Sequence, residues 1–104
     1  ALDSAQSLSQ VLHIAPESIL LASTGVIGQR IKMDALKAAL PELIASLSET
    51  GSDSAAKAIT TTDTVPKTIA LETMLHDRPV RIGGIAKGAG MIHPNMATML
   101  GFIT

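Results

Sequence analysis

The order of apolar and polar residues predicts helices in the first half of the chain. Apolar side chains recur at helical spacing over residues 3–14 and again over residues 33–47. Pro16 is expected to end the first helix, because proline cannot continue a helical hydrogen-bond ladder. For the same reason Pro41 is expected to divide the second pattern into two helical pieces.

Between these helices, a short apolar run predicts a strand. Residues 18–23 are mostly apolar and lie between Pro16 and Gly25, as expected of a buried central strand. Further along, residues 55–62 pass from a short helical stretch into β-branched residues at 59–62, which favour an extended backbone. The loop 51–54 separates this part from the preceding helix.

A β-hairpin is predicted in the last third of the chain. Residues 68–75 and 79–85 are strand-like, and residues 76–78 have a suitable length to join them. Gly83 and Gly84 are expected to bulge or weaken the second strand. Together the elements predict a mixed α/β or α+β fold with helices and sheets in layers.

Composition indicates how such a fold is filled. Of the 104 residues 46% are apolar, but Phe102 is the one aromatic residue, so the core must be aliphatic. Aromatic side chains supply much of the buried area in small domains. We therefore expect this chain to complete its packing against a partner segment. Because it starts at Ala1 rather than Met, we also expect it to be a segment of a longer polypeptide.

Charge and cysteine content exclude several classes of function. The formal net charge is −1, with 8 basic and 9 acidic residues, so neither nucleic acid nor an anionic membrane is an expected partner. The absence of cysteine excludes disulfides and thiolate metal sites and is compatible with the cytoplasm. No apolar run approaches the ~20 residues of a membrane helix.

The Ala97-Thr98 pair is the most informative candidate for chemistry. A threonine hydroxyl can attack the carbonyl before it, and hydrolysis of the resulting ester frees an α-amine beside the same hydroxyl. That amine titrates at about 7.7–8.0 and suits general-base catalysis. Since Ala-Thr pairs are common, a structural threonine at a helix start is the alternative.

Two glycine-rich turns offer binding groups. Backbone N–H groups at Thr24 and Gly25 could hold an oxyanion, although glycine is also common in turns for its backbone freedom alone. Lys87 lies among glycines but lacks the spacing of a phosphate-binding loop. It could bind a substrate carboxylate as a point charge, or it could be a solvated lysine.

The threonines of residues 60–64 and the histidines are weaker candidates. Residues 60–64 could hydrogen-bond a polar substrate, and a threonine-rich sheet edge is the alternative. His13, His76 and His93 lack the spacing of a zinc site, so no metal is expected. His93 is a helper base or, as the simpler interpretation, a loop residue.

Four motifs occur in one order along the chain, and together they are far more specific than any one of them. They are Ser23-Thr-Gly-Val-Ile-Gly28, Thr61-Thr-Asp-Thr-Val-Pro-Lys67, Gly84-Ile-Ala-Lys-Gly-Ala-Gly-Met91 and His93-Pro-Asn-Met-Ala-Thr-Met-Leu100. This set resembles the ornithine acetyltransferase family of arginine biosynthesis, also called bifunctional glutamate N-acetyltransferases. Residues 1–97 resemble the later part of its α chain, and residues 98–104 the start of its β chain.

The resemblance implies a self-cleaving, cytoplasmic transferase with an N-terminal-nucleophile-like aminopeptidase type of fold. Cleavage would fall between Ala97 and Thr98, and Thr98 would then carry acetyl from N-acetylornithine to glutamate. Thr24 and Gly25 would stabilise the oxyanion. No cofactor is implied, although members with both activities also accept acetyl-CoA.

By the same resemblance Thr61 and Lys87 would bind substrate with Thr98, and Thr64 is the next choice for Thr61. The partner implied is the β chain of the same precursor, in an αβ hetero-oligomer. Because most of the β chain is absent here, activity of this chain alone is not expected. Two alternatives stay open: an N-terminal-nucleophile amidohydrolase or aminopeptidase, and an inactive truncated domain that oligomerises.

Overall fold

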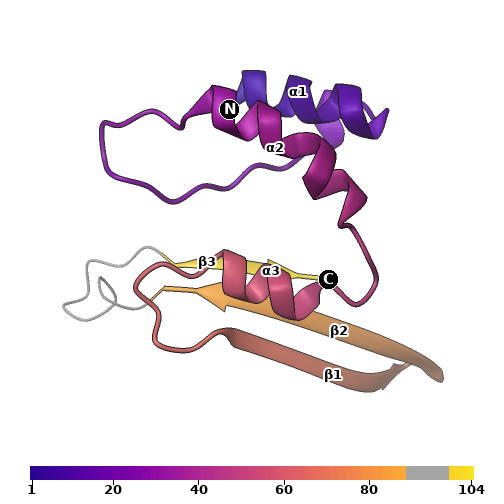
Figure 1. Cartoon of the computed structure of the whole chain (residues 1–104). Coiled ribbons are helices and arrows are strands. Elements are labelled where there is room, and N and C mark those ends of the chain that lie inside the picture. Colours follow the sequence, from indigo (N-terminus) through magenta and orange to yellow (C-terminus); the bar gives the residue numbers. More distant parts are fainter. Residues whose placement is uncertain (89–98) are drawn as a thin grey trace. The chain divides into compact units, whose positions relative to one another are not determined.

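A computed structural model describes residues 1–88 and 99–104 of the chain (Figure 1). The chain divides into two compact units, Ala1–Ser48 and Glu49–Thr104. The first unit is helical and the second combines one helix with a sheet. The predicted boundary at residues 97 and 98 lies outside the described residues.

Two helices build the first unit. Helix α1 (Leu2–Leu12) packs against α2 (Met33–Ala45). Ser4 and Ala5 are buried on α1, and Leu40 is buried on α2. The small side chains of α1 allow its backbone to come close to the neighbouring helix, so the apolar spacing in the sequence identified both helices correctly.

The helix ends differ from the sequence expectation. Helix α1 stops at Leu12 because His13 adopts a left-handed backbone with φ 55°. Pro16 instead begins a short 3₁₀ helix, η1 (Pro16–Ser18). The expected division of the second helix at Pro41 is wrong, since α2 runs through it. Proline removes one N–H donor, and its fixed φ of about −65° is itself compatible with a helix.

The strand expected at residues 18–23 does not form. Residues 19–32 contain neither helix nor strand, and Leu20 is 95% exposed. A strand needs a neighbour to accept and donate its backbone hydrogen bonds. The unit Ala1–Ser48 has no strand that could be this neighbour.

The second unit places one helix on an antiparallel sheet. Helix α3 (Ser52–Ala58) contacts β1 (Lys67–Leu75) and β2 (Arg78–Lys87), and Ala56 is 1% exposed. The described strands follow the order β1-β2-β3, with β3 (Leu100–Ile103) pairing antiparallel to β2. Figure 1 shows α3 lying along this sheet. The mixed α/β class predicted from the sequence is confirmed.

The predicted hairpin is confirmed, with a tighter turn than expected. Leu75 pairs with Arg78, so only His76 and Asp77 form the turn. Both have positive φ angles, 49° and 59°. Positive φ at both central residues is characteristic of type I′ turns, whose twist suits paired strands.

The bulge expected at Gly83 and Gly84 is absent. Gly83 pairs with Ala70 and Gly84 with Ile69, without an unpaired residue between them. A Cβ atom on Gly84 would lie 3.2 Å from Cγ2 of Ile69. The glycine therefore leaves room for this cross-strand side chain instead of interrupting the strand.

The extension expected at residues 59–62 is also wrong. Ile59 and Thr60 continue the last turn of α3, because the N–H of Thr60 donates to the carbonyl of Lys57 over 3.2 Å. Residues 61–66 then form bends and irregular backbone rather than a strand. Separately, no helix among the described residues has the length and apolar character needed to cross a membrane.

Candidate functional site

Two of the predicted substrate-binding residues meet at one end of the sheet. Lys87 is the last residue of β2, and its Nζ donates a hydrogen bond to Oγ1 of Thr61 over 2.9 Å. Lys87 is only 5% exposed. The alternative of a solvated lysine is therefore wrong. A buried ammonium group with a hydroxyl partner provides a fixed positive charge at this position.

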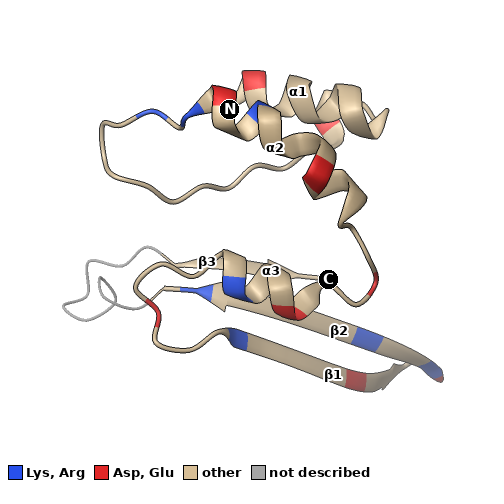
Figure 2. Cartoon of the chain, viewed as in Figure 1, with Lys and Arg blue, Asp and Glu red and all other residues tan. Residues whose placement is uncertain are grey.

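Asp63 ties this end of the sheet together. Its Oδ1 accepts hydrogen bonds from Nζ of Lys67 over 2.6 Å and from the backbone N–H of Gly88 over 2.9 Å. Its Oδ2 accepts one from the backbone N–H of Thr61 over 3.3 Å. The Asp63 side chain is 1% exposed. One carboxylate thus links the loop after α3 to the start of β1 and to the end of β2, where Figure 2 shows charged positions of both signs.

These donors stabilise the charged form of Asp63. The hydrogen bond from Lys67 is the main reason that the pKa of this carboxyl lies well below its usual range, and the Gly88 and Thr61 N–H groups add to it. Burial acts in the opposite direction but is outweighed. Asp63 is therefore ionised across the whole physiological range.

The strand after the expected cleavage site belongs to the same sheet. Leu100 pairs with Lys87, and Gly101 pairs with Ala86. Thr104 exchanges two backbone hydrogen bonds with Gly83, of 2.8 and 2.9 Å. The residues that resemble the start of a β chain are thus held against the strand that ends in Lys87.

The other predicted residues belong to the first unit or lie outside the described residues. Thr24 and Gly25 lie in the unit Ala1–Ser48, in the exposed stretch without helix or strand. A Cβ atom on Gly25 would meet nothing within 4 Å, so packing does not require glycine there. Ala97 and Thr98 lie outside the described residues, and so does His93.

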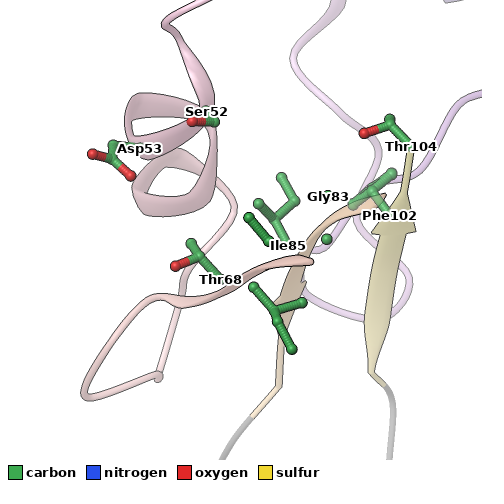
Figure 3. Close-up of a pocket in the computed structure, with 10 residues that line it drawn as sticks. Ser52, Asp53, Thr68, Gly83, Ile85, Phe102 and Thr104 are labelled. Carbon is green, nitrogen blue, oxygen red and sulfur yellow. The ribbon is translucent and has the colours of Figure 1, made fainter. Parts of the chain in front are cut away.

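A separate hollow opens between α3 and the sheet. It has a volume of about 470 Å³, and Figure 3 labels Ser52 and Asp53 of α3 and Thr68, Ile85 and Phe102 of the strands among its lining residues. None of the predicted substrate-binding or oxyanion residues is among its lining. The hollow is mostly apolar, whereas the Lys87 cluster carries the charge.

No metal site is found within residues 1–88 and 99–104, where no three histidine, aspartate or glutamate side chains gather. His13 and His76 have left-handed backbone conformations at a helix end and in the hairpin turn.

A family model described as the ArgJ family matches residues 1–104 of this sequence. The chain belongs to the ArgJ family. It is 72% identical over 102 residues to "Arginine biosynthesis bifunctional protein ArgJ 1" of a Nostoc species, a match that covers 98% of this chain and 25% of that protein. It is 57% identical over 106 residues to the chloroplastic ArgJ protein of Zea mays, covering 100% of this chain and 23% of that protein. The resemblance found in the four motifs is confirmed.

A solved ArgJ structure supports the fold. The arginine biosynthesis bifunctional protein of Bacillus halodurans matches with a TM-score of 0.75 and 37% identity, over 93% of this chain and 51% of that chain. The chain spans about a quarter of the length of the curated relatives it matches. Any activity and any substrates therefore belong to the longer family member, of which this sequence matches only a part.

Sequence reasoning missed the central place of Asp63 and its partner Lys67. In the sequence Asp63 is one polar residue among the threonines of residues 60–64. A signal was present, since Asp63 and Lys67 are opposite charges on either side of Pro66. Turns bring such residues together, but the contact with Gly88, 25 positions away, leaves no local pattern.

Proposed function

We propose that the parent protein is an acetyltransferase that moves acetyl from N-acetylornithine to glutamate through an acetyl ester on Thr98. In this proposal the precursor cleaves itself between Ala97 and Thr98, as the family motifs imply. Lys87 and Thr61 bind substrate, and Thr24 and Gly25 stabilise the oxyanion. No metal or organic cofactor takes part.

One arrangement carries this proposal. Lys87 bonds to Thr61 through its side chain and pairs with Leu100 through its backbone. Thr98 precedes Leu100 by two residues, and two residues of chain span at most about 7 Å. The strand that follows the expected nucleophile in sequence is thus paired with the residue that presents the buried ammonium.

The charge of Lys87 suits the proposed substrates. N-acetylornithine and glutamate share an α-carboxylate, and a buried ammonium can hold that group by a charge-assisted hydrogen bond. Because Lys87 is 5% exposed, competition from water is weak and the attraction is stronger than at the surface. If Lys87 holds the α-carboxylate of each substrate in turn, the acetyl donor and the acetyl acceptor would each lie next to the same hydroxyl. A two-step transfer requires this.

The chemistry follows from an N-terminal threonine. Attack by Thr98 Oγ on the Ala97 carbonyl breaks the Ala97–Thr98 C–N bond, which gives an ester and frees the α-amine of Thr98, and water then hydrolyses the ester to free the hydroxyl and the Ala97 carboxylate. That amine can take the hydroxyl proton while Oγ attacks the acetyl carbonyl. Ornithine leaves, and the amino group of glutamate then attacks the acetyl ester to give N-acetylglutamate.

Chain lengths among relatives support cleavage. This sequence matches 51% of the solved Bacillus halodurans chain but about 25% of the Nostoc protein. The solved chain is thus about half as long as the complete relative, as expected when a precursor is cut into two chains. The two chains would remain together as an αβ unit, with β3 paired to β2.

Two further properties belong to the same proposal. Acetyl-CoA serves as a second acetyl donor, which would account for the word "bifunctional" in the names of the relatives. The protein works in the cytoplasm. Several plant relatives are named chloroplastic, so a plant parent would place the same reaction in that organelle.

The proposal is tested by the intact mass of the full-length parent protein as wild type, Thr98→Ala and Thr73→Ala. Thr73 is an exposed threonine of β1 and serves as the matched control. We expect wild type and Thr73→Ala to split after Ala97, while Thr98→Ala stays whole. Cleavage of Thr98→Ala at the same bond would overturn the assignment of the nucleophile.

The cleaved enzyme is then given N-acetylornithine with and without glutamate. We expect N-acetylglutamate as the product when glutamate is present. Release of acetate at the same rate in both mixtures would show a hydrolase, and the transferase proposal would fail.

A further inference from the structure

Asp63 is used by none of the steps proposed above, although three hydrogen-bond donors converge on its carboxylate. It accepts hydrogen bonds from Lys67, from the N–H of Gly88 and from the N–H of Thr61. Its partners come from three places in the sequence, and the carboxylate itself is 1% exposed. A buried carboxylate needs hydrogen-bond donors. Folding alone does not require that two of these donors be the N–H of the substrate-binding Thr61 and the N–H of Gly88, next to the substrate-binding Lys87.

We propose that Asp63 is a positioning residue that fixes Thr61 and the Lys87-Gly88 end of β2, and thereby sets both substrate binding and self-cleavage. This inference rests on the proposed function. Asp63 touches no substrate in it. It acts by holding the backbone of one substrate-binding residue, Thr61, and the backbone next to the other, Lys87.

The hydrogen bonds show how one side chain holds both groups. Oδ2 of Asp63 holds the backbone of Thr61, whose own hydroxyl accepts from Lys87. Oδ1 holds the backbone of Gly88, the residue after Lys87. The Lys87–Thr61 pair is therefore fixed from both sides by the two oxygens of one carboxylate. A carboxylate can do this because it has about four acceptor positions and no donor.

The same contact also anchors the segment that contains the scissile bond. At its beginning, Gly88 is held by Asp63 and has φ 146°, a backbone conformation that side chains rarely adopt. At its end, Leu100 is held by pairing with Lys87. Both ends of the segment are thus tied to the same strand. The inferred effect on self-cleavage rests on these two attachments, because restricting reacting groups accelerates intramolecular reactions.

Lys67 supplies the charge that keeps this carboxylate ionised. Its ammonium group is 2.6 Å from Oδ1 of Asp63. The charged groups that face Asp63 are Lys67, directly, and Lys87, one hydrogen bond further through Thr61. Protonation would convert one acceptor oxygen into a donor and release one of the two backbone N–H groups.

The test uses the full-length parent protein as wild type, Asp63→Asn and the control Glu72→Gln. Glu72 also pairs with a basic side chain over 2.7 Å, but it is exposed and lies further along the hairpin. Self-cleavage is followed by intact mass over time, and the KM for N-acetylornithine is measured on the cleaved fraction. Both are measured well below the unfolding temperature of each variant.

For Asp63→Asn we expect cleavage to slow by about tenfold and the KM to rise by a similar factor, as loss of a hydrogen bond to a charged group would produce. Glu72→Gln should match wild type. A purely structural role would reduce the amount of folded enzyme without changing the KM. Wild-type cleavage and KM in Asp63→Asn would overturn the proposal.

If Asp63→Asn does not fold, Lys67→Met decides the question, because it keeps the carboxylate and removes its charged partner. We expect slower cleavage and a higher KM than in wild type at pH 7, and wild-type values of both would overturn the proposal. Failure of the proposed function is recognised separately. In that case the wild type itself neither cleaves nor transfers acetyl, and this inference falls with it.

Discussion

The Nζ atom of Lys87 donates a hydrogen bond of 2.9 Å to Oγ1 of Thr61, across 26 positions of sequence. Both residues are substrate-binding candidates by family resemblance. Their contact makes a single unit of two motifs that are separate in the sequence. Removing either partner should therefore affect the other.

Thr61→Val is expected to weaken substrate binding, because the buried Lys87 loses its hydroxyl acceptor. Loss of a hydrogen bond to a charged group costs about 1.5–3 kcal/mol. We expect the KM for N-acetylornithine to rise about tenfold in the full-length enzyme. Thr73→Val on the exposed face of β1 is the control and should leave the KM unchanged. Equal values of KM for the two variants would contradict a role of Thr61 in the site.

Asp63 should make the stability of the protein depend on pH. Its folded-state pKa is lowered by the Lys67, Gly88 and Thr61 donors. Its contribution to the free energy of unfolding is therefore complete above its unfolded-state pKa of about 3.9. The contribution is lost as pH falls from there through the lower folded value. We expect Asp63→Asn to melt below wild type at pH 7, with a gap that narrows below pH ~4. Melting curves over this range measure the gap, and a gap that widened in acid would contradict the assignment.

Gly88→Ala should lower the free energy of unfolding, whereas Gly101→Ala should leave it unchanged or raise it slightly. Gly88 has φ 146°, which an L side chain rarely adopts, so alanine there should cost about 1–3 kcal/mol. At Gly101 an added Cβ meets nothing within 4 Å, and alanine should be neutral or add up to about 1 kcal/mol. Chemical unfolding of the full-length protein compares them. Equal destabilisation by the two variants would contradict the prediction and would show that another part of the full-length protein packs against Gly101.

Asp77→Gly is expected to stabilise the hairpin. Asp77 has φ 59° in a two-residue turn after His76, and glycine is the preferred residue at this place. Relief of the left-handed strain should contribute about 1 kcal/mol. Asp77→Val, with a β-branched side chain at the same position, should destabilise by at least as much. Unfolding midpoints of both variants check the sign, and two changes in the same direction would exclude this turn geometry.

Local sequence pattern predicted the elements whose stabilising contacts lie close along the chain. Helices α1 and α2 follow from apolar spacing, and the β1-β2 hairpin follows from two strand-like runs around a short turn. Where the local pattern predicted the wrong element, the hydrogen bonds available to the backbone determined which structure formed. The apolar run 18–23 has no strand to pair with in its unit, and α2 continues through Pro41 because one missing donor leaves the rest of its ladder intact.

The sequence by itself determined the family of this protein and the residues worth testing, Thr61 and Lys87 among them, because motif order and residue type are properties of the chain alone. Only the tertiary structure showed that Lys87 is buried, that Thr61 is its partner, and that Asp63 holds the backbone of Thr61 and of Gly88. The physical reason is distance along the chain. Hydrogen bonds between atoms some 25 residues apart depend on strand pairing and loop closure, and no local spacing of residues encodes them.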